Sequence, residues 1–587
     1  MSAPDDLLAG LDPEQRQIAE CLRGPVSVLA GAGTGKTRTI THRIAHGVRT
    51  GAYAPDRVLA VTFTRKAAGE LQARLRALGA DGVSAQTFHS AALAQLGYFW
   101  PQLVGGPAPQ LLSGGKVTVL SQAAESQRMR LSSDTLRDIA AEIEWRKVSM
   151  LSIEAYAALL QAHEGGSARP VPTGVTAEQL VALHEAYGRI LEERRQIDFE
   201  DVLILTTGLL ESEPRAAMQT RERYRFFTVD EFQDVNPLQH ALLKVWLGDR
   251  DDVCVVGDAS QTIYSFTGAS SSYLLRFGHE YPNVREFRLE RNYRSTEPIV
   301  RVANHLMRDR PGALTLHAVR GETANGAGPG SEVAHGPAAP KGVPSPPSFE
   351  WFASELDEAE AVAASISAAI AGGVAASDIA VLYRTNAQSA AIETALQRVG
   401  VDARVHGAQR FFDRAEVRQA VMMLRGQAKV ADERPLFQIV SDVLRACGWQ
   451  SNPPAGAAGR EKWQALGAIL ALVDEQPPGT GVPEFSEELL ARSKAHHEPT
   501  LQNVTLSAVH AAKGLEWSLV HLIGMSEGFL PIVYAQSEDA LDEERRLAYV
   551  AFTRARDSLR ISGSAGGIRT QRPPSRFIAE AGLSPRR

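Results

Sequence analysis

The chain has 587 residues, which at ~150 residues per domain is enough for about four domains. It carries 62 basic and 68 acidic residues, a net charge of −6, with 44% hydrophobic and 22% charged residues, as is typical of globular proteins with large cores. No apolar run approaches the ~18 residues that span a bilayer, no signal-peptide pattern opens the chain, and its three cysteines lie too far apart for a disulfide framework or cysteine metal site. We therefore expect a cytoplasmic protein, in which mild acidity argues against coating of nucleic acid but allows a local basic channel.

Short apolar runs, each followed by a turn and a helical pattern, recur along the chain. The early runs are residues 26–30, 58–63, 226–229 and 253–256, and the later runs are residues 379–383, 504–508, 519–523 and 559–562. Alternation of strand, loop and helix is typical of a parallel sheet covered by helices. The sequence therefore predicts an α/β fold with two such cores.

Two stretches break this alternation, because they have helical spacing of apolar residues and few strand patterns. We interpret each as a helical insertion into one core, and we interpret the Gly- and Pro-rich segment 320–348 as a mobile linker. The expected domains are a first core (1–90 and 200–295) with insertion 91–199, and a second core (296–400 and 501–587) with the short insertion 401–500.

The segment AGAGTGKT at 30–37 closely fits a phosphate-binding loop. Glycines let the backbone fold so that N–H groups face phosphate oxygens, and the helix that starts near Lys36 adds its dipole. Lys36 would reach the β and γ phosphates and Thr37 would bind Mg²⁺, whereas an ordinary glycine-rich turn is the alternative. The expected nucleotide contacts in this loop are Ala30, Gly31, Ala32, Gly33, Thr34, Gly35, Lys36 and Thr37.

A phosphate loop needs a carboxylate at the end of a neighbouring strand, and Asp230 and Glu231 follow the apolar run 226–229. We expect Asp230 to hold Mg²⁺ through water and Glu231 to polarise the attacking water. Gln261 follows the next strand, where it would sense the γ phosphate. Arg294 and Arg554 are candidates for stabilising transition-state charge, with surface or interhelical salt bridges as the alternative.

Eleven segments, taken in order, extend these patterns over almost the whole chain. They are LDPEQRQI (11–18), AGAGTGKT (30–37), VTFTRKAAGEL (61–71), QTFHS (86–90), DFEDVL (198–203), VDEFQDVNPLQ (229–239), VVGDASQTIYSFTGA (255–269), LERNYRS (289–295), VLYRTNAQS (381–389), VHAAKGLEW (509–517) and DEERRLAYVAFTRA (542–555). In these segments the chain resembles the UvrD/Rep/PcrA-type superfamily 1 DNA helicases. The resemblance implies two RecA-like motor domains with ATP between them, and an insertion in each.

The resemblance also implies residue roles and partners. Gln15 would recognise adenine, Glu516 would contact the ribose, and Arg294 and Arg554 would act on the γ phosphate. Arg38 and Tyr293 would sandwich the adenine ring. The implied activity is Mg²⁺- and ATP-dependent translocation on single-stranded DNA with 3′→5′ unwinding, in bacterial DNA repair or replication and in association with the nucleoid. We expect a monomer, or a dimer that forms on DNA, acting on single strands and single-strand/duplex junctions and meeting repair or replication proteins.

A single DNA strand is gripped by stacking its bases on aromatic faces and by pairing its phosphates with donors, at ~1–3 kcal/mol per stacked base. The residues in DNA-facing segments are Thr62, Phe63, Thr87, His89, Tyr264, Phe266 and His510. The alternative is that the aromatic residues are core residues and the histidines satisfy internal hydrogen bonds.

The sequence departs from the family at two places. Phe266–Thr267 stands where relatives usually have Trp–Arg, and the second insertion is short. Two rival functions therefore stay open: a translocase that strips proteins from single strands but unwinds poorly, and a DNA-binding scaffold switched by ATP. The intact Lys36, Glu231, Arg294 and Arg554 argue against the scaffold.

Overall fold

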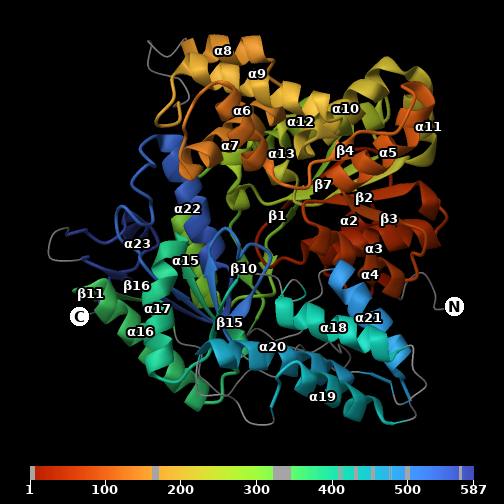
Figure 1. Cartoon of the computed structure of the whole chain (residues 1–587). Coiled ribbons are helices and arrows are strands. Elements are labelled where there is room, and N and C mark those ends of the chain that lie inside the picture. The colour runs from red at the N-terminus through yellow and green to blue at the C-terminus, as the bar shows by residue number, and fades with distance from the viewer. Residues whose placement is uncertain are drawn as a thin grey trace. The chain divides into compact units, whose positions relative to one another are not determined.

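The computed structural model divides the chain into two compact units, Met1–Gly31 with Gly35–Leu289 and Ala32–Thr34 with Glu290–Arg587 (Figure 1). It describes residues 7–161, 171–320, 346–406, 412, 414–428, 434–450, 457–474, 476–477, 479–495, 503–566 and 571–586. Each unit contains a large sheet in which the paired strands run parallel. This confirms the predicted α/β class with two RecA-like cores.

The sheet of the first unit has the strand order β3-β2-β6-β7-β1-β8. Its strands are β1 (Val26–Ala30), β2 (Val58–Thr62), β3 (Ser84–Thr87), β6 (Phe226–Val229), β7 (Val253–Gly257) and β8 (Arg285–Leu289). Parallel neighbours cannot be joined by tight hairpins, so each connection crosses over the sheet through helices or longer segments. The carboxyl ends of these strands therefore meet along one edge, where the polar loops follow.

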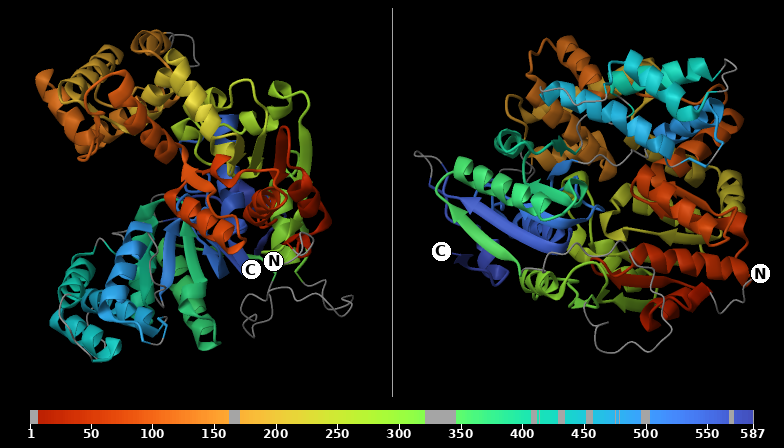
Figure 2. Two further views of the ribbon diagram at one scale, coloured as in Figure 1. Left: turned by 90° about the vertical axis from the view of Figure 1, so that its right-hand side faces the viewer. Right: turned by 90° about the horizontal axis from the view of Figure 1, so that it is seen from below.

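Alternate residues of the strands face opposite layers of helices. In β2, Val58 and Ala60 pack against one layer and Leu59 and Val61 against the other. The first layer is α2 (Pro13–Glu20), α3 (Lys36–Arg49) and α4 (Arg65–Ala77), and the second includes α5 (Phe88–Leu103), α10 (Phe199–Ser212), α11 (Pro214–Arg223), α12 (Pro237–Leu247), α13 (Ser272–Leu275) and α14 (Phe277–Glu280). Figure 2 gives further views of these layers.

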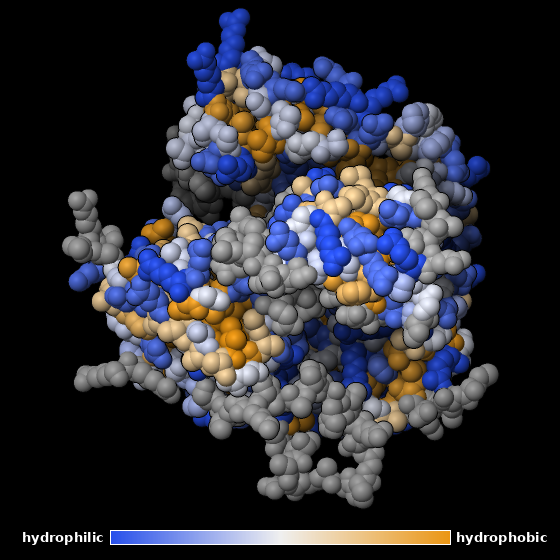
Figure 3. Space-filling view, turned by 60° about the horizontal axis from the view of Figure 1, so that its bottom comes forward, coloured by the Kyte–Doolittle hydropathy of each residue, from blue (hydrophilic) through white to orange (hydrophobic). Residues whose placement is uncertain are grey.

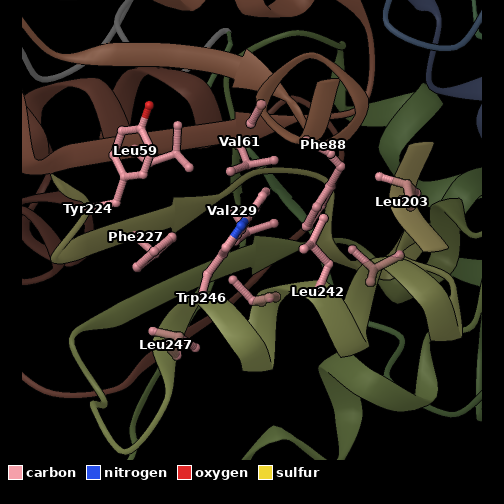
Figure 4. Packing of buried hydrophobic residues seen from close by; sticks show 14 of the residues in the cluster. Leu59, Val61, Phe88, Leu203, Tyr224, Phe227, Val229, Leu242, Trp246 and Leu247 are labelled. Carbon is pink, nitrogen blue, oxygen red and sulfur yellow. The ribbon is translucent and has the colours of Figure 1, made fainter. Parts of the chain in front are cut away.

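The core beneath the second layer centres on the buried Trp246 (Figure 4). Its ring stacks on Phe88 at 5.8 Å and on Phe227 at 6.2 Å between centroids. The indole N–H donates to Gln95 Oε1 at 2.9 Å, which satisfies its only polar atom. Since Phe88 and Gln95 lie on α5, most of this helix belongs to the sheet core, beyond the boundary at residue 90 that the sequence suggested.

The helices between α5 and α10 form a separate core of their own. They are α6 (Lys116–Ser126), α7 (Ser133–Val148), α8 (Ile153–Gln161) and α9 (Ala177–Glu193), flanked by the short parallel pair β4 (Gln110–Leu111) and β5 (Gln196–Ile197). Leu120, Ile139 and Leu183 are fully buried there. This mainly helical segment agrees with the fold class expected for the first insertion.

The sheet of the second unit has the order β13-β14-β12-β15-β16-β11-β17. Its strands are β11 (Ser348–Phe352), β12 (Ile379–Tyr383), β13 (Ala403–Val405), β14 (Val504–Ala508), β15 (Trp517–Leu522), β16 (Ala555–Ser564) and β17 (Pro585–Arg586), and a separate pair joins β9 (Arg291–Asn292) to β10 (His317–Ala318). The accompanying helices are α15 (Glu297–Leu306), α16 (Glu355–Ala371), α17 (Ser389–Arg398), α22 (Glu538–Phe552) and α23 (Arg576–Glu580).

Among the described residues between β13 and β14, four helices share a second apolar core. They are α18 (Ala415–Gln427), α19 (Leu436–Ala446), α20 (Ala457–Asp474) and α21 (Val482–Ala495). Strand β13 pairs with β14 in the sheet, although the sequence had placed residue 401 onward in the insertion. The four-part division with its stated boundaries stays a prediction, apart from these local differences.

The proposed linker 320–348 lies mostly outside the described residues, which include Arg320 and residues 346–348 of it. Arg320 Nη1 lies 2.9 Å from Asp557 Oδ1, and Ser348 begins β11 opposite Arg560. These two ends are therefore part of the folded second unit.

Hydrophilic and hydrophobic residues are interspersed over the described part of the face shown in Figure 3. Within the described ranges, no helix has the length and apolar character needed to cross a membrane.

Candidate nucleotide site and nucleic-acid interface

The phosphate-loop segment connects β1 to α3 through a tight turn. Gly33 and Gly35 adopt φ angles of +70° and +80°, which L side chains rarely adopt, and α3 begins at Lys36. A Cβ on Gly35 would lie 2.7 Å from Gln15 Nε2, so this position also lacks space for a side chain. A glycine turn that leads into a long helix presents backbone N–H groups to an anion.

Lys36 and two carboxylates lie close together beside this turn. Lys36 Nζ is 3.5 Å from Glu231 Oε1, and Asp230, only 8% exposed, directly follows β6, which is separated from β1 by β7 in the sheet. Burial, with a further contribution from Glu231, raises the pKa of Asp230 to about 7, while Lys36 opposes the shift. Glu231 has a φ of +53°, a strained angle for a residue with a side chain, and such strain concentrates at functional sites.

These groups fit a magnesium ion rather than a site built by many protein ligands. No group of three or more His, Cys, Asp or Glu residues suited to a metal occurs among the residues described. Mg²⁺ usually keeps several waters and takes one or two protein carboxylates together with phosphate oxygens. The Asp230 carboxylate and the Thr37 hydroxyl at the start of α3 are hard oxygen donors of that kind.

A hydrogen-bonded chain joins Glu231 to Gln261. Gln233 Nε2 donates to Glu231 Oε2 at 2.5 Å, and Gln233 Oε1 accepts from the Asp258 backbone N–H at 3.0 Å. Gln261 Nε2 then donates to Asp258 Oδ2 at 2.7 Å. The sequence identified Glu231 and Gln261 but missed Gln233 and Asp258, whose only signal was their position inside the same two segments.

The predicted adenine contacts divide between the two units. In the first unit, the buried Gln15 caps α2 with Asp12 and packs against Gly35, while Arg38 Nη2 donates to the Gly10 carbonyl at 2.7 Å. In the second unit, Tyr293 is 42% exposed, and its N–H donates to the Gly33 carbonyl at 2.9 Å.

Asn292, which the sequence did not single out, organises the segment around Tyr293. Its Nδ2 donates to the Ala32 carbonyl at 2.7 Å, and its Oδ1 accepts from the N–H groups of Arg294 at 2.9 Å and Ser295 at 2.7 Å. The side chain is 1% exposed, and all three of these partners belong to the second unit.

The two predicted phosphate arginines bond to groups of their own unit in this structure. Arg294 Nε donates to Glu516 Oε2 at 2.5 Å, so the predicted ribose contact and a predicted phosphate contact form an ion pair. Arg554 is 1% exposed and donates to the carbonyls of Val550 at 3.0 Å and Leu515 at 3.1 Å. Both assignments stay predictions.

Three aromatic residues form a cluster beyond the ends of β2 and β7. The Phe63 and Tyr264 rings stack at 5.5 Å with an interplanar angle of 13°, and Phe266 meets Tyr264 edge-on at 6.1 Å. Phe63 and Phe266 are 39% and 58% exposed, which is unusual for large apolar side chains. Exposed aromatic faces of this kind can stack nucleobases.

A pocket of about 430 Å³ adjoins Phe63 and is also lined by Arg65, Thr87, His89 and Phe199. The His89 and Phe199 rings meet edge-on at 5.5 Å. Burial, then Lys116 and Arg65, lower the pKa of His89 to about 4, so the ring is neutral near pH 7. Arg65 and Phe199 were not predicted, although both lie in the segments quoted for the resemblance.

The remaining predicted DNA contacts differ in their surroundings. Thr62 is buried, and its hydroxyl has no hydrogen-bond partner within the described structure. Thr87 caps α5 by accepting from the Ser90 N–H at 3.1 Å. His510 follows β14 in the second unit, where burial, then Arg384 and Lys513, lower its pKa to about 4.

A glycine loop at the start of a helix, with carboxylates at the end of another strand of the same sheet, defines the class of phosphate-loop nucleotide hydrolases. Residues 11–282 match the model of the UvrD/REP helicase N-terminal domain, and residues 287–453 and 467–565 match that of the UvrD-like helicase C-terminal domain.

The chain is similar to three bacterial helicases over nearly its whole length. It is 44% identical to the ATP-dependent DNA helicase UvrD2 of Mycobacterium tuberculosis H37Rv, covering 98% of this chain and 82% of the relative. It is 27% and 28% identical to the ATP-dependent DNA helicases PcrA of Bacillus subtilis 168 and Staphylococcus aureus Mu50, covering 98% of this chain and 86% of each. The chain belongs to the UvrD/Rep helicase family and is an ATP-dependent DNA helicase of the UvrD/PcrA type.

Proposed function

We propose that this helicase translocates along single-stranded DNA and unwinds duplexes with 3′→5′ polarity, in bacterial DNA repair or replication. One observation supports a link between ATP hydrolysis and DNA binding. Gln261, in the hydrogen-bonded chain of the nucleotide site, and Tyr264, in the aromatic cluster, belong to the same turn after β7. A shift of this turn on hydrolysis would therefore move a base-stacking residue.

In the nucleotide site, Lys36 would neutralise the β and γ phosphates, and Thr37 and Asp230 would hold Mg²⁺, which supplies positive charge to the phosphate oxygens. Glu231 would accept a proton from the attacking water, because its carboxylate lies beside Lys36 at the end of β6. Gln261 would sense the presence of the γ phosphate.

Further nucleotide contacts are proposed from the family resemblance. Gln15, Arg38 and Tyr293 would bind adenine, and Glu516 would bind the ribose. Arg294 and Arg554 would stabilise charge on the γ phosphate. Arg294 could bind the γ phosphate only after its ion pair with Glu516 opens. The γ phosphate would therefore compete with the Glu516 carboxylate for the Arg294 guanidinium.

On the DNA side, Phe63, Tyr264 and Phe266 would stack bases, since two of them expose large ring surfaces. Thr87 and His89 line the adjoining pocket with Phe63, which supports a role for the pocket in holding a base or sugar. Thr62 would contact the strand beside Phe63, and His510 would do so from the second unit.

A tailed-duplex assay tests this proposal. With ATP and Mg²⁺, a duplex carrying a 3′ single-stranded tail should open and one carrying a 5′ tail should stay closed. Lys36→Ala should abolish opening and DNA-stimulated ATP hydrolysis. Preferential opening from the 5′ tail would refute the polarity, and turnover that DNA does not raise would refute the motor.

The second candidate, a translocase that displaces proteins but unwinds poorly, is favoured by the short second insertion of four helices between β13 and β14. Displacement of streptavidin from a biotinylated single strand, compared with opening of a 3′-tailed duplex, separates the two. Rapid displacement with no opening would favour this candidate. An ATP-switched scaffold would show neither.

A further inference from the structure

The side chain of Gln233 is fully buried (0% exposed) between the ends of β6 and β7. Its Nε2 donates to Glu231 Oε2 at 2.5 Å and to Asp234 Oδ2 at 3.3 Å. Its Oε1 accepts from the Asp258 N–H at 3.0 Å. One neutral amide therefore uses both its donor and its acceptor to join two strand ends.

The space for this amide is made by Gly257, the last residue of β7. A Cβ at Gly257 would lie 2.4 Å from Gln233 Oε1 and 2.9 Å from Leu274 Cδ2. Gly257 is not among the glycines with positive φ, so its backbone conformation suits other residues. Glycine is needed here for the close approach of the Gln233 side chain rather than for the turn.

Beyond Gly257, the amide is connected to the turn that carries Gln261. Asp258 accepts from the Ser260 N–H at 3.0 Å and from Gln261 Nε2 at 2.7 Å, and it is itself buried. The Asp258 backbone N–H, which donates to Gln233, therefore lies at the start of a hydrogen-bonded turn. Displacement of Gln233 would release both the Glu231 carboxylate and this turn.

We propose that Gln233 is a positioning residue that fixes the Glu231 carboxylate relative to the Asp258–Gln261 turn for ATP hydrolysis. It acts through Glu231 and does not touch the nucleotide. One Glu231 oxygen is held by the amide, and the other faces Lys36 at 3.5 Å, so the orientation of the carboxylate is set from both sides. The inference rests on the proposed role of Glu231 as the group that polarises water.

The first test replaces Gln233 with a side chain of similar length that makes no hydrogen bonds. Gln233→Met should lower kcat for DNA-stimulated ATP hydrolysis at least tenfold, while KM for ATP stays within threefold. Gln239→Met is the matched control, because Gln239 is also buried and hydrogen-bonded, but in the capping box of α12. The control should keep kcat within twofold. A folded Gln233→Met chain with kcat within threefold of the unmodified chain, or a loss equal to that of the control, would overturn the proposal.

The second test uses Gln233→Glu, which keeps the length and shape of the side chain but changes the donor that faces Glu231 and Asp234. An ionised Glu can accept from Asp258 but repels Glu231, whereas a protonated Glu donates to Glu231 as the amide does. The kcat of this variant relative to the unmodified chain should rise at least threefold from pH 8 to pH 6. A ratio independent of pH would count against positioning, since a packing role alone does not depend on protonation.

Glu231→Gln is measured in the same assay to separate the two claims. If it keeps kcat within threefold, the proposed role of Glu231 is wrong and the inference about Gln233 falls with it. If it loses activity while Gln233→Met does not, only the inference about Gln233 is refuted.

Discussion

Two groups of buried lysines and carboxylates lie in the first unit, and they differ in how closely the charges pair. The loop cluster contains Lys36, Asp230, Glu231 and Asp258. The α10 cluster contains Lys116, Lys147, Asp198, Glu200 and Asp201. Both clusters combine mostly buried lysine and carboxylate side chains, so the function of each cluster must be judged from geometry.

In the α10 cluster the charges meet at hydrogen-bonding distance. Lys147 Nζ lies 2.8 Å from Asp198 and 2.7 Å from Asp201, and Lys116 lies 2.6 Å from Glu200. Burial would raise the pKa of Asp198, but Lys147 holds it down to about 2, whereas burial raises the pKa of Glu200 to about 7 in spite of Lys116. These pairs fasten the first turn of α10 to α6 and α7, which is a structural task.

In the loop cluster Lys36 Nζ lies 3.5 Å from Glu231 Oε1, and burial raises the pKa of Asp230 to about 7. The loop cluster holds three carboxylates and one lysine beside a glycine turn, and a bound cation would offset part of this negative charge. The comparison teaches that a raised carboxylate pKa does not by itself indicate a ligand site, since both clusters contain one; the adjoining glycine turn and the printed pairing distances distinguish the two clusters.

The sharpest test of this comparison is Glu231→Gln. We expect kcat to fall by about 10²–10⁴-fold, because a general base contributes that much, with little loss of thermal stability. Steady-state ATP hydrolysis with single-stranded DNA and a thermal unfolding scan measure the two effects. Large destabilisation with retained turnover would place the loop cluster in the structural class.

Lys147→Met should produce the opposite pattern. Removal of one partner leaves buried carboxylates uncompensated, which costs about 3–5 kcal/mol in the free energy of unfolding. Urea unfolding measures this loss, and ATP-analogue binding by the folded fraction should be unchanged. Lys244→Met is the control, since Lys244 is exposed and 3.8 Å from its partner carboxylate. A control as damaging as Lys147→Met would contradict the distinction.

The pH dependence of stability provides a third test. The folded pKa of Asp230, about 7, lies above the ordinary value near 4, so its contribution to stability is full below pH 4 and is lost as pH rises through 7. Without ligands, the unmodified chain should lose roughly 2–3 kcal/mol relative to Asp230→Asn between pH 5 and pH 8, at about 1.4 kcal/mol per pKa unit.

Urea unfolding at a series of pH values measures this difference, and the exposed carboxyl variant Asp134→Asn serves as the control. If the difference in the free energy of unfolding between Asp230→Asn and the unmodified chain stayed constant across the pH range, burial would not be raising the pKa of Asp230. Addition of Mg²⁺ and an ATP analogue should reduce the difference at pH 8.

The smallest effects are expected outside both clusters, at the aromatic residues. Tyr264→Ala and Phe266→Ala should each weaken binding of oligothymidylate by about 1–3 kcal/mol, since each removes a stacking surface. Basal ATP hydrolysis should change less than twofold. Tyr98→Ala, an exposed aromatic on α5 outside the cluster, should leave the binding unchanged. Equal weakening by all three would argue against base stacking.

Much of the fold followed from apolar runs. The runs at 26–30, 226–229, 379–383 and 504–508 coincide with β1, β6, β12 and β14. The strands β3 and β8 were missed because they form the two edges of their sheet, where half-exposed strands need no continuous apolar run. Strand β11 was missed because it begins inside a Pro-rich segment.

The candidate site was predictable where chemistry dictates residue type, as at Lys36 and Asp230. Gln233 and Asn292 were missed because a buried amide has no periodicity, and its role depends on groups from other strands. The pairing distances that distinguish the two charge clusters could not be predicted from the sequence either. In both clusters the lysines and carboxylates come from helices and strands that lie far apart in the sequence.

The strand order also constrains how the protein is made. Strand β1, which leads into the phosphate loop, pairs with residues 254–257 and 285–289. During synthesis the loop therefore emerges early but gains its neighbouring strands only after residue 289, while α6–α9 can form their own core in the interval. Nascent chains arrested at residue 250 should fail to retain an ATP analogue, whereas those of 320 residues should begin to bind it. The interruption of the first sheet by a helical insertion thus postpones the appearance of ATP binding until the whole first unit has been translated.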